Sequence, residues 1–122
     1  MIELLRGFPD NVVALRARGE VTKKDYDEVL IPAVEKTLKT HEKVRILYEL
    51  GPEFDGYDAG AAWEDFKVGM EHLSRWERIA VITDVEWIGV ATRLFSVFLP
   101  GTIRVYPHAE AAKARLWITQ AA

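Results

Sequence analysis

Six carboxylates in the middle of this 122-residue chain are spaced so that they can meet at one edge of a sheet. They end or follow two predicted strands: Glu49, Glu53, Asp55, Asp58, Asp84 and Glu86. Converging carboxylates can hold a hard cation such as Mg²⁺, or can perturb one another enough to support acid–base chemistry. Each also has a simpler role as a helix cap, a turn former or a solvated group. We therefore expect no metal site and no catalytic residue, and single out Asp55, Asp84 and Glu86 as the subset to test.

The other residues with catalytic potential are scattered along the chain. His41, His72 and His108 are far apart, and none has a second ligand at H-x-x-x-H spacing. The absence of cysteine excludes disulfides, thiolate metal sites and a cysteine nucleophile. No phosphate-binding loop, dinucleotide fingerprint or nucleophile elbow occurs in the sequence. The sequence therefore predicts a protein that is not an enzyme and that carries no cofactor.

Residues 85–99, VEWIGVATRLFSVFL, are the most unusual segment. In a helix their polar side chains fall within an arc of about 120°, whereas packing on one sheet face takes an apolar stripe of only about 100°. The residues that we expect to form a ligand or partner surface are Trp87, Ile88, Leu94, Phe95, Phe98 and Leu99. Three interpretations stay open. The helix is buried in its own monomer, or it forms a subunit interface, or it contacts a lipid, a membrane surface or a small apolar ligand.

Composition and charge limit the class of protein. An apolar fraction of 49% and a charged fraction of 29% are ordinary for a globular protein, and the length fits one domain over 1–122. A net charge of −3 gives no general attraction to nucleic acid. The sequence has no signal-peptide pattern and no apolar run of about 20 residues. We expect a cytoplasmic protein, with peripheral contact at the inner membrane as an option.

The elements that must position these residues follow from hydrophobic periodicity. Strands are expected at 2–6, 12–18, 44–50, 78–83 and 102–106. Helices are expected at 22–40, 59–73, 85–99 and 110–119, with a break in the first of them near 30–31 because of Pro32. A hairpin followed by alternating helices and strands implies an α/β fold. Its sheet is mixed and mostly parallel, with an N-terminal antiparallel hairpin and about four flanking helices.

A glycine-rich, acidic loop is expected at 51–60, after the third strand. Ligands of such sheets bind beyond the carboxyl ends of the strands. The residues that we assign to this loop edge are Phe54, Asp55, Tyr57, Asp58 and Asp84. Together with the 85–99 helix, the loop is predicted to gate a shallow apolar site.

Three stretches resemble the SpoIIAA-like family of small bacterial proteins, which has the STAS fold of sulfate transporters and anti-sigma factor antagonists. They are IPAVEKTLKTHEKVRILYEL, AAWEDFKVGMEHLSRWERIAVITD and EWIGVATRLFSVFLPGTIRVYP, and together they span about 20–107. The resemblance implies this fold and a noncatalytic interaction or ligand-binding role. Related folds of the Sec14/CRAL-TRIO type shelter apolar ligands beside a mobile helix.

One property of the anti-sigma antagonists does not carry over. Their switch is a serine that is phosphorylated at the start of the helix after the third strand, in an Asp-Ser-Ser-Gly motif. The matching stretch is Asp58-Ala59-Gly60, and no serine or threonine occurs from 51 to 73. We therefore expect a noncatalytic binding domain that forms a homodimer and has no phosphoserine switch. It uses the 85–99 helix for an apolar ligand, lipid or membrane, or alternatively for a permanent protein interface.

Overall fold

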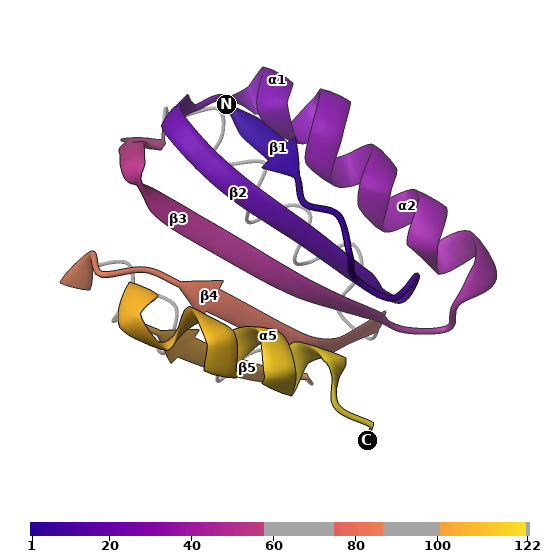
Figure 1. The fold of residues 1–122 in the computed structure, drawn as a ribbon. Coiled ribbons are helices and arrows are strands. Elements are labelled where there is room, and N and C mark those ends of the chain that lie inside the picture. Colours follow the sequence, from indigo (N-terminus) through magenta and orange to yellow (C-terminus); the bar gives the residue numbers. More distant parts are fainter. Residues whose placement is uncertain (58–74, 87–100, 122) are drawn as a thin grey trace.

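The computed structural model describes residues 1–57, 75–86 and 101–121, with residues 51–57 described by their backbone only. Five strands form one sheet in the order β1-β2-β3-β4-β5 (Figure 1). The strands are β1 (Ile2–Leu4), β2 (Val12–Val21), β3 (Val44–Tyr57), β4 (Trp76–Ile82) and β5 (Thr102–Tyr106). β1 is antiparallel to β2 and the other pairs are parallel, which confirms the predicted mixed sheet and its N-terminal hairpin.

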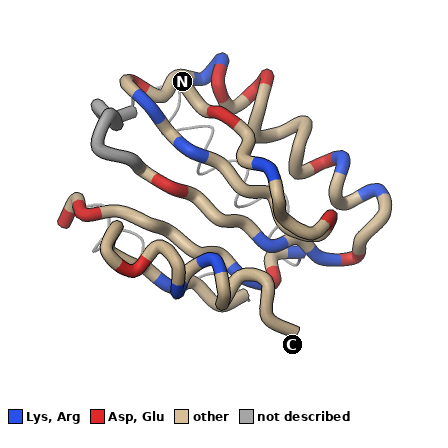
Figure 2. The backbone as a smooth tube through the Cα atoms, viewed as in Figure 1, with Lys and Arg blue, Asp and Glu red and all other residues tan. Residues whose placement is uncertain are grey.

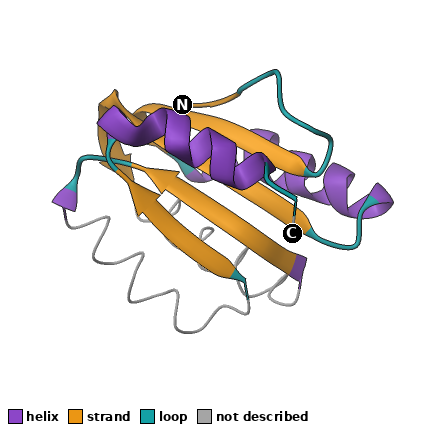
Figure 3. Ribbon diagram, turned by 60° about the horizontal axis from the view of Figure 1, so that its bottom comes forward, coloured by secondary structure: helices purple, strands orange, loops and turns teal. Residues whose placement is uncertain are grey.

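Helices cover both faces of this sheet. On one face lie α1 (Lys23–Asp25), the π-helical turn η1 (Tyr26–Leu30) and α2 (Ile31–Thr40). On the other lie the short 3₁₀ turn η4 (His108–Glu110) and α5 (Ala111–Thr119), which contacts β3, β4 and β5 (Figure 3). The predicted helix at 59–73 and all but the first two residues of that at 85–99 lie outside the described residues. We predicted about four flanking helices. The described part of the chain instead has one helical layer on each face of the sheet.

Alternation along β2 places side chains in two separate cores. Val13 and Leu15 belong to the core beneath α2, with Tyr26 and Val34. Val12 and Ala14 belong to the smaller core beneath α5; its other buried members are Leu47, Ala80, Ile82, Ala114, Trp117 and Ile118. Successive residues of a strand face opposite sides, so a strand covered on both faces is apolar at consecutive positions.

The break predicted at Pro32 takes the form of one wide helical turn. Pro32 has no N–H, and in a regular α-helix its ring would clash with the carbonyl four residues earlier. The chain avoids this clash because the Ile31 N–H donates to the Tyr26 carbonyl, five residues back. Pro32 then falls in the first turn of α2, where no intrahelical donor is required.

The first helical turn, α1, begins with a capping box at Thr22. The Asp25 N–H donates to the Thr22 hydroxyl at 3.4 Å, and the Thr22 N–H donates to the Asp25 carboxylate at 2.8 Å. Burial raises the pKa of Asp25, but the Thr22 hydrogen bonds and the Met1 ammonium, 3.4 Å away, outweigh it. The net effect holds the pKa of Asp25 below its ordinary value of 3.8.

The expectation of a loop at 51–57 is wrong, because β3 continues to Tyr57. Ala17 pairs with Leu50, and Gly19 then pairs with Phe54, so three residues of β3 bulge out opposite one of β2. Gly19 has φ +58°, a left-handed conformation that glycine adopts without strain, and this lets β2 turn and resume pairing. β2 consequently runs to Val21 rather than ending near 18. Residues 58–60 of the predicted loop lie outside the described residues.

Candidate functional site

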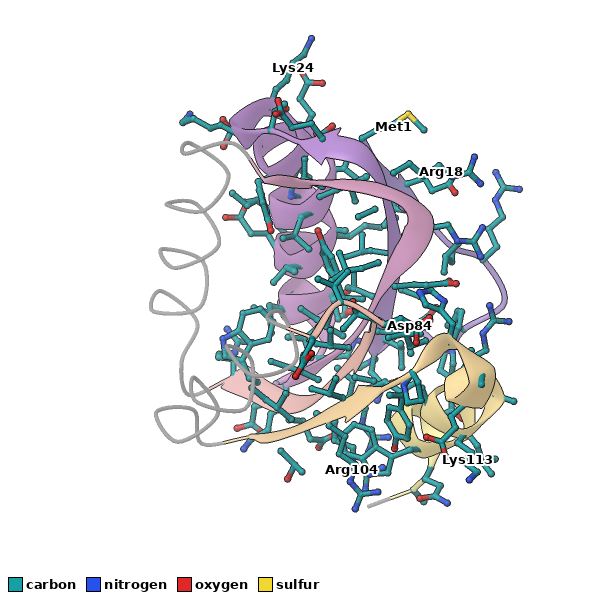
Figure 4. All side chains as sticks on the ribbon, turned by 90° about the vertical axis from the view of Figure 1, so that its left-hand side faces the viewer. Met1, Arg18, Lys24, Asp84, Arg104 and Lys113 are labelled. Atoms are coloured by element: carbon teal, nitrogen blue, oxygen red, sulfur yellow. The ribbon has the colours of Figure 1, made fainter. Side chains whose placement is uncertain are left out.

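The carboxyl ends of β2, β3 and β4 meet at one edge of the sheet, as expected for parallel strands. This carboxyl edge carries Arg16 on β2, Glu49 on β3, Asp84 after β4 and His108 after β5. Figure 4 shows Asp84 on the α5 side of the sheet. The side chains at this edge therefore include Glu49 and Asp84 from the predicted carboxylates, together with Arg16 and His108, to which the sequence analysis assigned no role.

Glu49 is held by Arg16 across the parallel β2–β3 pair. Their backbones are register partners, and Nε and Nη2 of Arg16 donate to Oε2 of Glu49 at 3.2 and 3.1 Å. The Glu49 side chain is only 12% exposed, so this contact neutralises a nearly buried carboxylate. Arg16 also lies 3.6 Å from Glu3 on β1, which in turn pairs with Arg18 at 3.0 Å. The face of β1 and β2 beside α5 is thus crossed by linked ion pairs.

His108 connects three strand ends. Its Nε2 lies 2.7 Å from the Leu50 carbonyl oxygen, and its Nδ1 lies 3.9 Å from Oε1 of Glu49. Its backbone N–H donates to Oδ1 of Asp84 at 3.1 Å. Sequence reasoning missed this link because His108 stands alone in sequence. Its position two residues after a parallel strand, which puts it at the carboxyl edge, was the available signal.

The chain leaves β4 through Thr83, whose side chain is buried. The Thr83 N–H donates to the Tyr106 carbonyl at 2.9 Å, and its hydroxyl accepts the Val85 N–H at 3.0 Å. Val85 packs against the core beneath α2, whereas Asp84 and Glu86 are exposed. The apolar segment 85–99 thus begins at the carboxyl edge, with its first side chain on the α2 side of the sheet.

The predicted site residues are described only in part. Of the carboxylate subset, Asp84 and Glu86 are exposed at the carboxyl edge, and Asp55 lies in the β3 extension, where the backbone alone is described. Phe54 and Tyr57 lie in the same extension, paired through their backbones with Gly19 and Val21. The remaining predicted residues lie outside the described residues: Asp58, Trp87, Ile88, Leu94, Phe95, Phe98 and Leu99. Among the residues whose side chains are described, 1–50, 75–86 and 101–121, no three His, Asp or Glu side chains are grouped so that they could hold a metal ion.

A second polar cluster, which the sequence did not reveal, lies at the opposite edge. Arg45 on β3 is 6% exposed; it is paired with Glu77, and its Nη1 donates to the carbonyls of Ile118 at 3.0 Å and Gln120 at 2.5 Å. Arg78 on β4 donates to the carbonyls of Trp117 at 2.9 Å and Gln120 at 3.0 Å. These arginines supply cations and donors to the C-terminal end of α5, where the helix dipole and its free carbonyls favour them. Their role is structural.

The Trp117 ring contacts two guanidinium groups on this side of the sheet. The guanidinium carbons of Arg78 and Arg104 lie 5.4 and 4.7 Å from its ring centroid. Such contacts contribute at least about 0.5–1 kcal/mol each, and more where the ring is buried, as it is here. Figure 2 shows Lys and Arg residues gathered where β3 and β4 begin, close to the end of α5.

No helix of the described chain has both the length and the apolar character needed to cross a membrane. A family model described as SpoIIAA-like matches residues 12–119. The fold is similar to the crystal structure of an uncharacterized protein of the DUF3478 family, with a SpoIIAA-like fold, from Shewanella loihica PV-4. The TM-score is 0.77 and the identity 29%, and the match covers 97% of this chain and 92% of that one. No match is found among the curated proteins.

Proposed function

Since the chain belongs to the SpoIIAA-like family, we propose that it is a noncatalytic binding module whose working surface is the apolar segment 85–99. The occupant proposed for this surface is an apolar small molecule, a lipid or a membrane surface. The observation that carries the proposal is the composition of the segment, which is apolar over more of a helix than one sheet face can cover.

The placement of Val85 supports this choice of surface. Its side chain packs on the core beneath α2, and Thr83 holds its backbone N–H, so the segment starts from a fixed point. This starting point lies at the carboxyl edge, where ligands of parallel sheets bind. Burying one phenylalanine or leucine side chain contributes about 1.5–3 kcal/mol. Micromolar binding requires about 8 kcal/mol beyond the entropic cost of association, so several such side chains must be buried together at the contact.

A noncatalytic role fits the chemistry of the carboxyl edge. Glu49 is paired with Arg16, the His108 ring is bonded to the Leu50 carbonyl, and Asp84 accepts the His108 N–H. Each of these polar groups is thus engaged in holding strand ends together. Residues 58–60 supply no phosphorylatable side chain, so we propose that binding proceeds without a phosphoserine switch.

A second function is favoured by the family itself. The SpoIIAA-like fold is a protein-interaction domain type. The alternative is therefore a regulatory module in which segment 85–99 is a permanent interface, either with a second copy of this chain or with another protein.

Native mass spectrometry of protein purified without detergent separates these functions. An apolar adduct of a few hundred daltons supports the binding function, and an adduct-free dimer supports the interface. A bare monomer overturns both a retained apolar ligand and a permanent interface with a second copy of this chain. The matched variants are Phe98→Ser in the segment and Leu116→Ser on α5, where the side chain is 65% exposed. Phe98→Ser is expected to weaken the adduct or the dimer about tenfold or more, and Leu116→Ser to leave both unchanged.

A further inference from the structure

Two guanidinium groups meet at one aromatic ring, on the side of the sheet that α5 covers. Arg78 on β4 and Arg104 on β5 share this side, because Ala80, which is two residues from Arg78 and is the register partner of Arg104, belongs to the core beneath α5. Their guanidinium carbons lie 5.4 and 4.7 Å from the centroid of the Trp117 ring. Trp117 is 7% exposed and therefore gives both groups a fixed surface. Two like charges are thus held close together.

Most hydrogen-bond donors of this arginine pair have no acceptor in the described part of the chain. Arg104 is exposed and takes part in no hydrogen bond or ion pair there. Arg78 uses only Nη1, which donates to the carbonyls of Trp117 and Gln120. The Nε and Nη2 donors of Arg78, and all five N–H groups of Arg104, are left for water or for a ligand.

The acidic side chains next to the pair along the chain do not neutralise it. Glu77 on β4 is paired with Arg45, and Glu110, just before α5, is paired with Lys113 at 2.9 Å. Lys113 and Arg104 lie at the same margin of the molecule in Figure 4. The described side chains around the Trp117 ring therefore carry a net positive charge, although the net charge of the whole chain is −3.

We propose that the arginine pair is a binding site for a phosphate group, carried by a small soluble molecule or by a lipid headgroup. A phosphate monoester has a charge of about −1.5 to −2 at neutral pH and offers three acceptor oxygens, so it matches two guanidinium groups. A carboxylate is already satisfied by one bidentate arginine. An anion between the two groups also relieves their mutual repulsion. The site is independent of what segment 85–99 binds, since Val85 packs on the opposite, α2 side of the sheet.

The pair is preorganised for this role. Nη1 of Arg78 is held by two carbonyls, and the guanidinium of Arg104 is stacked on a nearly buried ring. A guanidinium that is fixed in this way loses less side-chain freedom when it binds. The negative end of the α5 dipole offsets part of the charge of Arg78. Arg104 therefore supplies the main attraction for the phosphate, and Arg78 keeps its structural role while it adds a second donor.

Side-chain NMR of the whole protein tests the site directly. Inorganic phosphate replaces sodium chloride at constant ionic strength, and the Nε–H signals of the arginines are followed. The expected result is a saturable shift of the Arg104 and Arg78 signals. Arg104→Gln should weaken phosphate binding about tenfold or more, because it removes a charged hydrogen-bonding partner. Arg115→Gln is the matched control: Arg115 is exposed on α5 about 200° around the helix from Trp117, and the variant should leave the affinity unchanged.

A second experiment identifies the source of the phosphate group. The protein is sedimented with phosphatidylcholine vesicles that contain or lack phosphatidic acid. Retention that depends on phosphatidic acid and is lost in Arg104→Gln supports the site with a lipid headgroup as its ligand. Phosphate binding without retention supports the site with a small soluble ligand. An Arg104 signal in the wild type that shows no saturable shift, or equal weakening by Arg104→Gln and Arg115→Gln, would overturn the proposal. The wild-type titration decides the matter even if a variant fails to fold.

Discussion

Replacing Arg45 by methionine removes the buried cation that holds the end of α5 against the sheet. The variant loses the Glu77 ion pair and the hydrogen bonds to the carbonyls of Ile118 and Gln120. The Gln120 carbonyl keeps a donor in Arg78, and Glu77 is half-buried and can turn to water. The Ile118 carbonyl is the group that loses its side-chain donor.

The expected cost follows from these three groups. A hydrogen bond to a charged group contributes about 1.5–3 kcal/mol, and an unsatisfied buried carbonyl costs about 1–3 kcal/mol. For Ile118 the two figures describe the same lost hydrogen bond, so they are not added. The apolar methionine side chain recovers part of the lost stability by its own burial. We expect a net decrease of about 3 kcal/mol in the free energy of unfolding, which corresponds to about 10 °C in Tm for a domain of this size.

Urea unfolding gives the free energy, and amide hydrogen exchange identifies the region affected. Exchange should accelerate first in α5, because the two lost contacts other than the Glu77 pair involve its C-terminal end and the residue that follows it. Lys113→Met is the matched control: Lys113 is on the same helix, 71% exposed, and its pair with Glu110 should contribute less than about 0.5 kcal/mol. An Arg45→Met variant within about 0.5 kcal/mol of the wild type, or unchanged exchange in α5, would refute the role given to Arg45.

Three other predictions use the same unfolding assay. Gly101→Ala should destabilise the fold by about 1–3 kcal/mol, because its Cβ would lie 2.6 Å from the Trp76 carbonyl oxygen; a smaller loss would mean that β5 can move away from β4. Gly19→Ala should cost about 1–2 kcal/mol through its φ of +58° alone, since no atom beyond the adjacent residues lies within 4 Å of the added carbon, and Gly19→Asn should recover part of that loss. The pKa of Asp25 is lowered by folding, so its charge stabilises the fold above about pH 3.8 and this contribution is lost as the pH falls through the lowered pKa. The stability difference between the wild type and Asp25→Asn should therefore shrink on acidification below pH 3.8, and a difference independent of pH would contradict the capping role.

Hydrophobic periodicity was enough to predict the sheet. A strand with a core on one face alternates apolar and polar residues, and a strand with a core on both faces is apolar throughout. The N-terminal hairpin, the parallel pairing of the later strands and the strand at 102–106 are all confirmed. The effect of Pro32 was also predictable, since a missing donor is a local property of the chain. The form of the break before Pro32 was not predicted: the helix widens for one turn and is not interrupted.

The β3 extension could not be predicted from local signals. Gly51, Pro52 and Gly56 are turn formers, and their composition favours a loop. Pro52 falls among the three residues that bulge out of the pairing with β2, so its missing N–H breaks no bond of that pair. Long-range pairing with β2, made possible by the conformation of Gly19, decides the structure here. Arg45 was similarly visible only as a break in an apolar run, because its partners Ile118 and Gln120 lie more than 70 residues away.

The polar contacts that the sequence missed have a common consequence for α5. At its C-terminal end, Arg45 and Arg78 bind the last carbonyls, and just before its N-terminal end His108 bonds to the Leu50 carbonyl. Between these ends Trp117 packs on the smaller core. A helix that is fixed at both ends and packed between them belongs to the rigid scaffold, because displacing it would expose several buried polar groups at once. A partner is therefore better accommodated where the chain leaves the carboxyl edge at Val85 than on the face beneath α5. This distinction is testable, since substitutions on the exposed face of α5 should leave binding unchanged, whereas those in segment 85–99 should weaken it about tenfold or more.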